Sequence, residues 1–248
     1  MKEFPKDRDW EMVVFDIDGT LMDFNGFIPE MIPLIRRLEE LGLIVSLASG
    51  RTLPNITPIM QSLALSGFIV AENGGIVWDT IEGHKIRVLA DGSRAKEAAL
   101  WLSTKIDGFN PDGIESNRWR ETEWCLYPDE DYDKMCSLLS SSKWDDLLVV
   151  KTGFAIHIIS SKIDKSVGLN VALEQRNIDP SKIISCGDGP NDIPMFGISG
   201  WSVSIDNRVE EVVAAADYST KKNGTAGTIE FLEDLIDILE SNGADGRI

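Results

Sequence analysis

In the stretch Met12-Val13-Val14-Phe15-Asp16-Ile17-Asp18-Gly19-Thr20, four apolar residues are followed at once by two acidic residues and a glycine. A short run of consecutive apolar residues predicts a strand that is buried on both faces, as in a parallel sheet. Side chains two positions apart in an extended segment point to the same side, so the carboxylates of Asp16 and Asp18 face one point in space. The stretch therefore predicts a buried strand whose carboxyl end carries two convergent acids.

Helices and further apolar strands alternate on either side of this stretch. Apolar residues recur at helical spacing from Met31 to Leu41, and Gly42 suits the end of that helix. Strands are predicted at residues 43–48, 68–71, 182–186, 201–205 and 218–220, and further helices at residues 164–176, 207–216 and 225–240. This alternation predicts an α/β fold built on a doubly wound parallel sheet, in which ligands bind at the carboxyl ends of the strands.

The pattern changes at about residues 80–160. Half-polar strands are predicted there at residues 85–89, 122–127, 147–151 and 154–159, and amphipathic helices at residues 93–106 and 129–141. We therefore expect a discontinuous core domain of residues 1–79 and 161–248 and an inserted α+β domain of residues 80–160. Residues 240–248 are expected to form a frayed tail.

A second acidic segment, Gly187-Asp188-Gly189-Pro190-Asn191-Asp192, follows the strand at residues 182–186. If that strand neighbours the first one, four carboxylates converge. Two carboxylates about 4 Å apart repel by on the order of 4 kcal/mol at an effective dielectric of about 20, so the cluster needs a multivalent cation. Oxygen ligands without histidine or cysteine select Mg²⁺ over zinc. Mg²⁺ is the expected cofactor, and its candidate ligands are Asp16, Asp18, Asp188 and Asp192.

Two other positions could bind an anion at the same edge. Ser49-Gly50-Arg51 ends the strand at residues 43–48, where a hydroxyl and exposed backbone N–H groups could bind phosphate oxygens. Lys165 lies in the first turn of a helix, where a cation opposes the helix dipole unless an anion neutralises both. Solvated turns for the acidic segments and a solvent-facing Lys165 are the alternatives.

The composition narrows the class of protein. A chain of 248 residues with 43% apolar residues can form one large or two modest cores. The formal charge of −17 disfavours nucleic acids and anionic membranes as partners. Three scattered cysteines without a Cys-x-x-Cys pair argue against disulfides and zinc, and no secretory signal or long apolar stretch is found, so we expect a cytoplasmic location. Monomer and homodimer are both open.

Four motifs resemble, in order, the signature motifs of haloacid dehalogenase superfamily hydrolases: Asp16-x-Asp18-Gly19-Thr20, Ser49, Lys165 and Gly187-Asp188-x-x-Asn191-Asp192. The insertion after Glu72-Asn73-Gly74-Gly75 is similar to the α/β cap that Cof-like members carry between the second and third motifs. A closer likeness, to archaeal phosphoglycolate phosphatases, is carried by Gly153-Phe154-Ala155-Ile156-His157-Ile158 and by Ala216-Asp217-Tyr218. The resemblance implies a Rossmann-like core, a cap and a Mg²⁺-dependent phosphatase activity.

The resemblance also implies a role for each motif residue. Asp16 would be the nucleophile that forms an aspartyl phosphate, and Asp18 the general acid to the leaving oxygen and then the base to water. Mg²⁺ would be held by Asp16, the main-chain carbonyl of Asp18, Asp188 and Asp192. The transferring phosphoryl group would be bound by Ser49, Gly50, Lys165 and Asn191.

The implied substrate is a small phosphorylated metabolite, 2-phosphoglycolate. Ser49-Gly50-Arg51 is shared with sugar-phosphate phosphatases of the same cap type, and phosphomutases use the same pair of aspartates, so both are alternatives. Arg118 and Arg120 flank Trp119 in the insertion, where a guanidinium could pair with the carboxylate of a phospho-acid or lie in a solvated loop. A binding module without activity is a further alternative that the intact acidic motifs disfavour.

Overall fold

The protein is described by a computed structural model that covers residues 4–6, 8–81, 83 and 85–245. Within these residues the larger sheet has eight strands, in the spatial order β13 (Tyr218–Ser219), β12 (Trp201–Ser204), β11 (Ile183–Gly187), β1 (Met12–Phe15), β4 (Ile44–Ala48), β5 (Phe68–Ala71), β6 (Ile76–Asp79) and β7 (Ile86–Val88). The strands from β13 to β5 are parallel, whereas β6 and β7 are antiparallel to their neighbours. The predicted α/β sheet is confirmed, with an antiparallel pair added at one edge.

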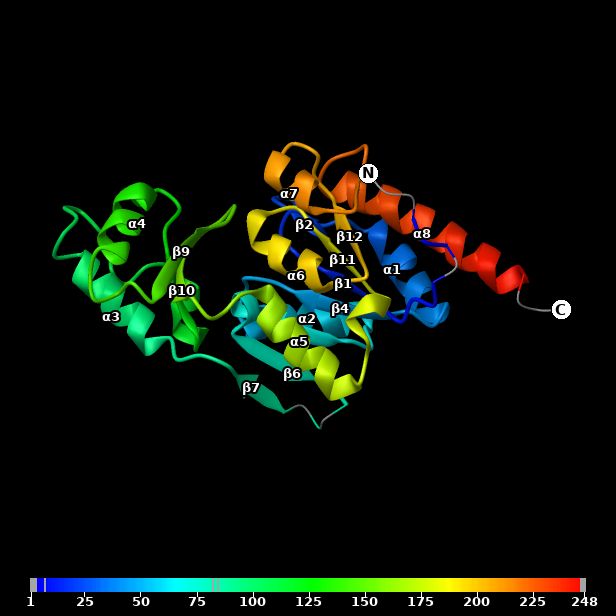
Figure 1. Ribbon diagram of the computed structural model, residues 1–248, viewed down its shortest axis with the longest axis horizontal. Coiled ribbons are helices and arrows are strands. Elements are labelled where there is room, and N and C mark those ends of the chain that lie inside the picture. Colours follow the sequence, from blue (N-terminus) through cyan, green and yellow to red (C-terminus); the bar gives the residue numbers. More distant parts are fainter. Residues whose placement is uncertain (1–3, 7, 82, 84, 246–248) are drawn as a thin grey trace.

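Helices cover both faces of this sheet (Figure 1). One face packs on α1 (Met31–Glu40), α2 (Leu53–Leu63) and α8 (Thr225–Asp245), and the other on α5 (Lys165–Arg176), α6 (Ile193–Ile198) and α7 (Glu210–Ala215). The alternation along β1 explains the two layers. Val13 and Phe15 join the first hydrophobic cluster and Met12 joins the second, because successive side chains of a strand point to opposite faces.

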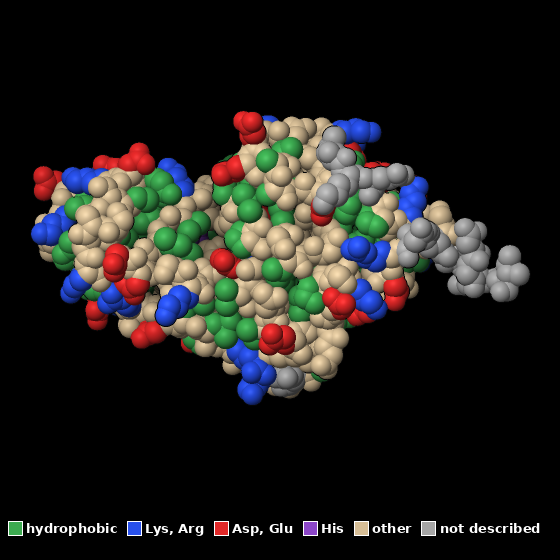
Figure 2. All heavy atoms as spheres, in the orientation of Figure 1, with side chains coloured by type: hydrophobic (Ala, Val, Ile, Leu, Met, Phe, Trp, Pro, Cys, Tyr) green, Lys and Arg blue, Asp and Glu red, His purple; other side chains and the backbone are tan. Residues whose placement is uncertain are grey.

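A second, smaller unit lies beside one end of the sheet and is joined to it through a narrower waist (Figures 1 and 2). It consists of an antiparallel sheet in the order β8 (Glu123–Leu126), β10 (Ile156–Ser160), β9 (Leu147–Lys151), with α3 (Ser93–Leu102) and α4 (Tyr132–Ser140) packed against it. Its own hydrophobic cluster includes Leu102, Leu139, Ile156 and Ile158. We call these three strands and two helices, together with the segments that connect them, the cap.

The strand expected at residues 85–89 was assigned to the insertion, and this placement is wrong. β7 pairs with β6 in the larger sheet, with Ile76 opposite Val88. Its alternating exposure is that of an edge strand, a pattern that an open cap sheet and the edge of a larger sheet share. The division into two domains stays a prediction, and the strand pairing places its first boundary after Val88 rather than at residue 80.

Several elements of the larger unit were not predicted from the sequence, among them α2, β6, α6 and the hairpin of Met22–Asp23 and Gly26–Phe27. Pro54, Pro58 and several polar residues obscure α2, although its apolar residues Ile56, Met60 and Leu63 recur at helical spacing and are buried. β6 follows β5 so closely that the two look like one interrupted run. The frayed tail expected at residues 240–248 is wrong for its first part, since α8 continues to Asp245. Residues 246–248 lie outside the described part.

The remaining regular segments are short. A hairpin of β2 (Met22–Asp23) and β3 (Gly26–Phe27) follows the first acidic motif, and single turns of 3-10 helix lie at Glu72–Gly74, Glu115–Trp119, Pro180–Lys182 and Pro190–Asp192. Across the described ranges of the chain, none of the helices is long and apolar enough to cross a membrane.

Candidate active site

The site lies where β11, β1 and β4 end. β1 pairs with β11 on one side and β4 on the other, all three parallel, so the loops that follow them meet at one edge of the sheet. Asp16 follows β1, Ser49 follows β4, and Asp188 follows β11. The adjacency on which the sequence prediction of converging carboxylates depended is therefore present.

Lys165 lies at the centre of the site, with its side chain fully buried. It is the first residue of α5, whose N-terminus is capped by the side chain of Asp164. Its Nζ donates hydrogen bonds of 2.6 Å to Oδ1 of Asp16 and of 2.6 Å to Oδ1 of Asp192. Burial alone would lower the pKa of Lys165, but the two carboxylates outweigh it and raise the pKa above its usual value. The alternative of a solvent-facing lysine is excluded.

Asp16, Asp188 and Asp192 form a compact group of carboxylates, with one oxygen of each within 4.8 Å of the others. Burial, together with the charge of Asp192, raises the pKa of Asp188 to about 7. Burial likewise raises the pKa of Asp16 well above its ordinary value, against the opposing charge of Lys165. Three carboxylates face one ammonium group here, so the donor set fits a hard divalent cation that would neutralise the excess charge.

Backbone geometry holds two of these carboxylates in place. The backbone N–H groups of Asp188 and Gly189 donate to Oδ2 of Asp192 at 3.0 Å each. Thr20 donates from its hydroxyl to Oδ1 of Asp188 at 3.1 Å. Gly19 has a φ of 89°, and a Cβ there would lie 2.1 Å from Oδ2 of Asp188. Glycine is therefore required at position 19 for two reasons: the backbone has a positive φ, and a side chain would collide with Asp188.

The carboxylate of Asp18 does not belong to this group within the described residues. Arg51 binds it through two hydrogen bonds, from Nε at 2.8 Å and from Nη2 at 2.6 Å. A paired guanidinium fixes the plane of a carboxylate, so Arg51 orients the Asp18 side chain rather than leaving it free to turn. The prediction that four carboxylates converge is therefore wrong for Asp18, because three carboxylates meet here and the fourth turns to Arg51. Ligation of a metal by the main-chain carbonyl of Asp18 stays a prediction.

The three remaining predicted residues surround the same edge. The Ser49 hydroxyl is buried and accepts a hydrogen bond of 3.2 Å from the backbone N–H of Arg51. Gly50 accepts at its carbonyl from Nη1 of Arg120 at 3.0 Å. Asn191 donates from Nδ2 to the side chain of Asn73 at 3.2 Å.

A buried polar network that the sequence did not indicate lies beside Gly50. His157, Glu123 and Cys125 bring possible ligand atoms within 4.8 Å of one another. Each is already engaged by protein groups, since Nδ1 of His157 lies 3.0 Å from both Oε2 of Glu123 and Sγ of Cys125, and Glu123 also pairs with Arg120. We interpret this network as a hydrogen-bonded contact between the cap and the larger unit. Glu123 and Cys125 come from β8, but His157 comes from β10 and lies 32 residues after Cys125, so local spacing did not reveal the network.

Comparison with known proteins agrees with the motifs. The sequence model of the haloacid dehalogenase-like hydrolase family matches residues 13–91 and 122–232. A phosphoglycolate phosphatase of Haloarcula marismortui is 31% identical over 231 residues, which are 90% of this chain and 96% of that protein. A phosphoglycolate phosphatase of Methanopyrus kandleri is 30% identical over 238 residues, which are 93% of this chain and 99% of that protein.

The fold has a close counterpart among solved structures. A crystal structure of a protein from Thermoplasma acidophilum matches with a TM-score of 0.81 at 23% identity, covering 92% of this chain and 99% of that chain. The segments that match the family model contain Asp16, Ser49, Lys165 and Asp188, the residues that meet at the ends of β1, β4 and β11. The chain belongs to the haloacid dehalogenase-like hydrolase family.

Proposed function

We propose that this protein is a Mg²⁺-dependent phosphatase that transfers a phosphoryl group from a small metabolite to Asp16 and then to water. The observation that carries the proposal is the buried contact of Lys165 with both Asp16 and Asp192, next to Asp188. A phosphoryl group in transfer is highly anionic, so catalysis depends on placed positive charge. Here the buried ammonium of Lys165 supplies one positive charge. The carboxylate cluster beside it could bind a divalent cation, which would supply more.

Asp16 would act as the nucleophile. Lys165 engages its Oδ1, so Oδ2 is the oxygen that is available to attack phosphorus. The new bond joins Oδ2 to phosphorus while the bond from phosphorus to the leaving oxygen breaks, and that oxygen takes a proton from Asp18. Asp18 then accepts a proton from water, whose oxygen attacks phosphorus. Inorganic phosphate leaves and the carboxylate of Asp16 is restored.

Three carboxylates and one carbonyl would hold Mg²⁺: those of Asp16, Asp188 and Asp192, and the main-chain carbonyl of Asp18. The cation supplies neutralising charge to the cluster and to the phosphoryl oxygens. Lys165 favours the ionised form of Asp16 against the effect of burial and orients its side chain, and Arg51 keeps the Asp18 carboxyl in one orientation between its two proton transfers. Ser49, the backbone of Gly50 and Asn191 would bind the remaining phosphoryl oxygens.

The pKa of Asp188 leads to a prediction for metal binding. Because this carboxyl group has a pKa of about 7 in the metal-free fold, it is protonated below that pH, and a proton competes with Mg²⁺. The apparent affinity for Mg²⁺ should fall by about tenfold between pH 8 and pH 6, as expected for one coupled proton. Calorimetric titration in two buffers of different ionisation enthalpy measures both the affinity and the released proton.

The pKa of Asp188 also determines whether the metal-free protein becomes more or less stable as the pH rises. The folded pKa is above the usual carboxylate value, so the metal-free fold binds this proton more tightly than the unfolded chain does and loses stability as the pH rises from about 4 to about 7. Asp188→Asn is the control for the metal titration, and its weaker binding of Mg²⁺ should depend less on pH than that of the wild-type protein. Equal affinity for Mg²⁺ at both pH values would contradict the assignment of Asp188 as a ligand.

We propose 2-phosphoglycolate as the substrate, because relatives at 30–31% identity over most of the chain are phosphoglycolate phosphatases. A panel of phosphoglycolate with glucose, mannose and sucrose phosphates should give the highest kcat/KM for phosphoglycolate. A preference of about a hundredfold for a sugar phosphate, equivalent to about 2.7 kcal/mol, would reassign the substrate and leave the chemistry intact. Transfer of the phosphoryl group to a second sugar hydroxyl instead of water would favour a phosphomutase.

A cytoplasmic location and the choice between monomer and homodimer stay predictions. Partners are expected to be limited to the small phosphorylated metabolite.

A further inference from the structure

The turn between β5 and β6 has an unusual backbone. Glu72 and Asn73 have φ values of 50° and 53°, in the left-handed region, and Gly74 follows at 105°. This region is unfavourable for residues other than glycine, least so for asparagine, and such strain is found at functional sites. Glu72 is also buried, and its carboxylate accepts from the backbone N–H and the hydroxyl of Thr122 in the segment that leads into the cap. Contacts with the cap therefore help to hold this turn.

Asn73 makes contacts in three directions. Its backbone N–H donates to the carbonyl of Ser49 at 3.1 Å. Its Oδ1 accepts from Nδ2 of Asn191 at 3.2 Å, and its Nδ2 lies 3.1 Å from Oε2 of Glu123 and 3.2 Å from Nδ1 of His157. A side-chain amide is both donor and acceptor, so Asn73 can accept from the active-site loop while it donates to the cap.

The contact with Asn191 crosses the active-site edge of the sheet. Asn73 follows β5, whereas Asn191 follows β11, and both β4 and β1 lie between these strands. The amide pair therefore spans the strand end that carries Asp16. Gly50 lies against the Asn73 side chain, since a Cβ there would be 3.1 Å from both its Nδ2 and its Oδ1. One amide thus contacts the loops after β4 and β11 together.

On the cap side, the amide meets a buried group of Arg120, Glu123 and His157, which we call the junction cluster. All three side chains are at most 1% exposed. Burial alone would raise the pKa of Glu123, but His157 and Arg120 lower it to about 2, so Glu123 is a fixed anion. This anion holds the NH₂ end of the Asn73 amide toward the cap, which leaves the oxygen end for Asn191.

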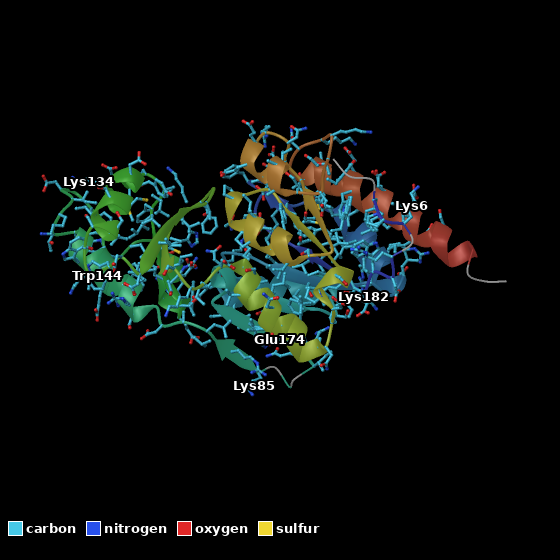
Figure 3. All side chains as sticks on the ribbon, viewed as in Figure 1. Lys6, Lys85, Lys134, Trp144, Glu174 and Lys182 are labelled. Carbon is cyan, nitrogen blue, oxygen red and sulfur yellow. The ribbon has the colours of Figure 1, made fainter. Side chains whose placement is uncertain are left out.

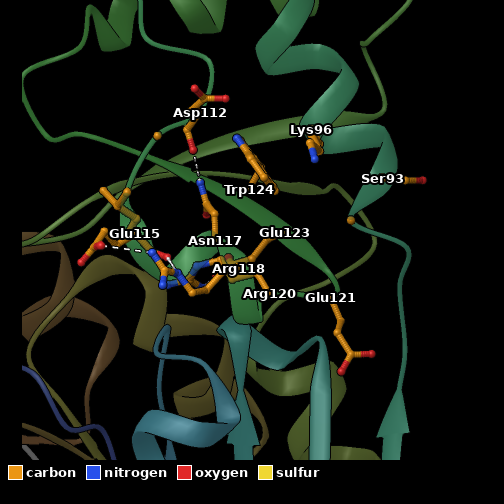
Figure 4. Close-up of a pocket in the computed structure, with 13 residues that line it drawn as sticks. Ser93, Lys96, Asp112, Glu115, Asn117, Arg118, Arg120, Glu121, Glu123 and Trp124 are labelled. Atoms are coloured by element: carbon orange, nitrogen blue, oxygen red, sulfur yellow. Dashed lines mark hydrogen bonds and ion pairs between the residues drawn. The ribbon is translucent and has the colours of Figure 1, made fainter.

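Arg120 strengthens the same connection. It pairs with Glu123 and donates to the carbonyl of Gly50, whereas Arg118 is exposed and pairs with Glu115 (Figure 4). A cavity of about 640 Å³ opens in the cap next to these arginines. The residues that line it include Arg120 and Glu123 but not Asp16, Lys165 or Asp188, so this cavity is separate from the reacting groups.

We propose that Asn73 is a positioning residue for the reaction. Through its contacts with the junction cluster on one side and with Asn191 and the loop at Ser49 and Gly50 on the other, it makes the orientation of the loop residues depend on where the cap lies. The inference rests on the proposed function and extends it. Asn73 does not touch the reacting atoms. It links the position of the cap to the geometry of the phosphate-binding loops through a single amide. This amide cannot rotate to exchange its oxygen and nitrogen while Glu123 is ionised, because its oxygen would then face the carboxylate.

Asn73→Asp tests this link with little change of shape. The new carboxylate can still accept from Asn191, but it faces the carboxylate of Glu123 and has no donor for it. We expect kcat to fall by about 10²-fold, the usual effect of misplacing a catalytic geometry by about 1 Å. Binding of vanadate, which mimics the transition state, should weaken in parallel with kcat, while binding of inorganic phosphate changes much less.

A double variant tests the pair itself. In N73D/E123Q the amide and the carboxylate exchange places, so the new amide at position 123 donates to the new carboxylate at position 73 and the total charge is unchanged. We expect this variant to recover at least about tenfold of the lost kcat, a coupling that independent sites would not show. Asn73→Gly is the second single variant, because glycine adopts a φ of 53° without strain, and it should lose kcat although its backbone is intact.

Asn117→Asp is the matched control. Asn117 is a buried asparagine of the cap whose amide binds the carbonyls of Asp112 and Cys125, away from the phosphate-binding loops. Its variant should lose stability but keep kcat within about threefold at a temperature where it is folded. Wild-type kcat in both N73D and N73G, or no recovery in N73D/E123Q, would overturn the proposal. If the wild-type protein hydrolyses no phosphate ester, the proposed function fails instead.

Discussion

Asp16→Asn should abolish turnover, with a loss of at least about 10⁴-fold in kcat, because an amide cannot form the phosphoryl intermediate. The change removes a charge without removing volume. It leaves Lys165 with Asp192 as a partner and reduces the repulsion among the three carboxylates. We therefore expect the metal-free variant to melt at or above the temperature of the wild-type protein, a result that separates lost chemistry from lost folding.

Asp23→Asn is the matched control for this variant, since Asp23 is an exposed aspartate of β2 beside the same loop. It should keep wild-type kcat. Activity of Asp16→Asn within tenfold of the wild type would mean that another group is the nucleophile, and the mechanism would have to be abandoned.

Lys165→Met should destabilise the protein and inactivate it. The fully buried ammonium binds Asp16 and Asp192, and its removal leaves two carboxylates buried without a cation. Breaking a buried ion pair from one side typically destabilises a protein by about 3–5 kcal/mol. The loss of a charge placed against the transferring phosphoryl group should lower kcat by a further factor of about 10²–10³. Denaturant unfolding and steady-state kinetics measure the two effects separately.

The structure offers a matched control for this lysine. Lys182 also contacts two acidic side chains, Glu11 at 2.5 Å and Asp9 at 3.5 Å, but its own side chain is 36% exposed. It directly precedes β11 and lies on the side of the larger unit away from the cap (Figure 3). Lys182→Met should change stability by less than about 1 kcal/mol. Added Mg²⁺ should restore part of the stability of Lys165→Met, because a cation can relieve the same carboxylates. Equal stability of the two variants would refute the central role of Lys165.

The sequence predicted the parts of the fold that depend on local pattern. The apolar run from Met12 to Phe15 and the capping residue Asp164 specify their elements within a few residues, because burial on both faces and an N-cap are local signals. The predictions failed where one local pattern is compatible with two different structures. The edge strand β7 has the same half-polar alternation as a cap strand, and two prolines hid the buried stripe of α2.

The site shows the same division. Asp16, Asp188 and Lys165 were predicted because each follows or begins an element at the same edge of the sheet, and the structure brings them together. The ion pair of Asp18 with Arg51 and the network around Asn73 were not predicted. Both depend on how side chains from separate loops turn toward one another, and a single sequence records the spacing of residues along the chain but not that orientation.

The most direct measurement of the central claim is a rapid-quench experiment with the substrate of highest kcat/KM, radiolabelled in its phosphoryl group. If Asp16 is the nucleophile, acid quenching during turnover traps label on the protein, and peptide analysis places it on Asp16. The Asp16→Asn variant should show no label under the same conditions. Full turnover of the wild-type protein without any trapped label, or label on a residue other than Asp16, would contradict the account.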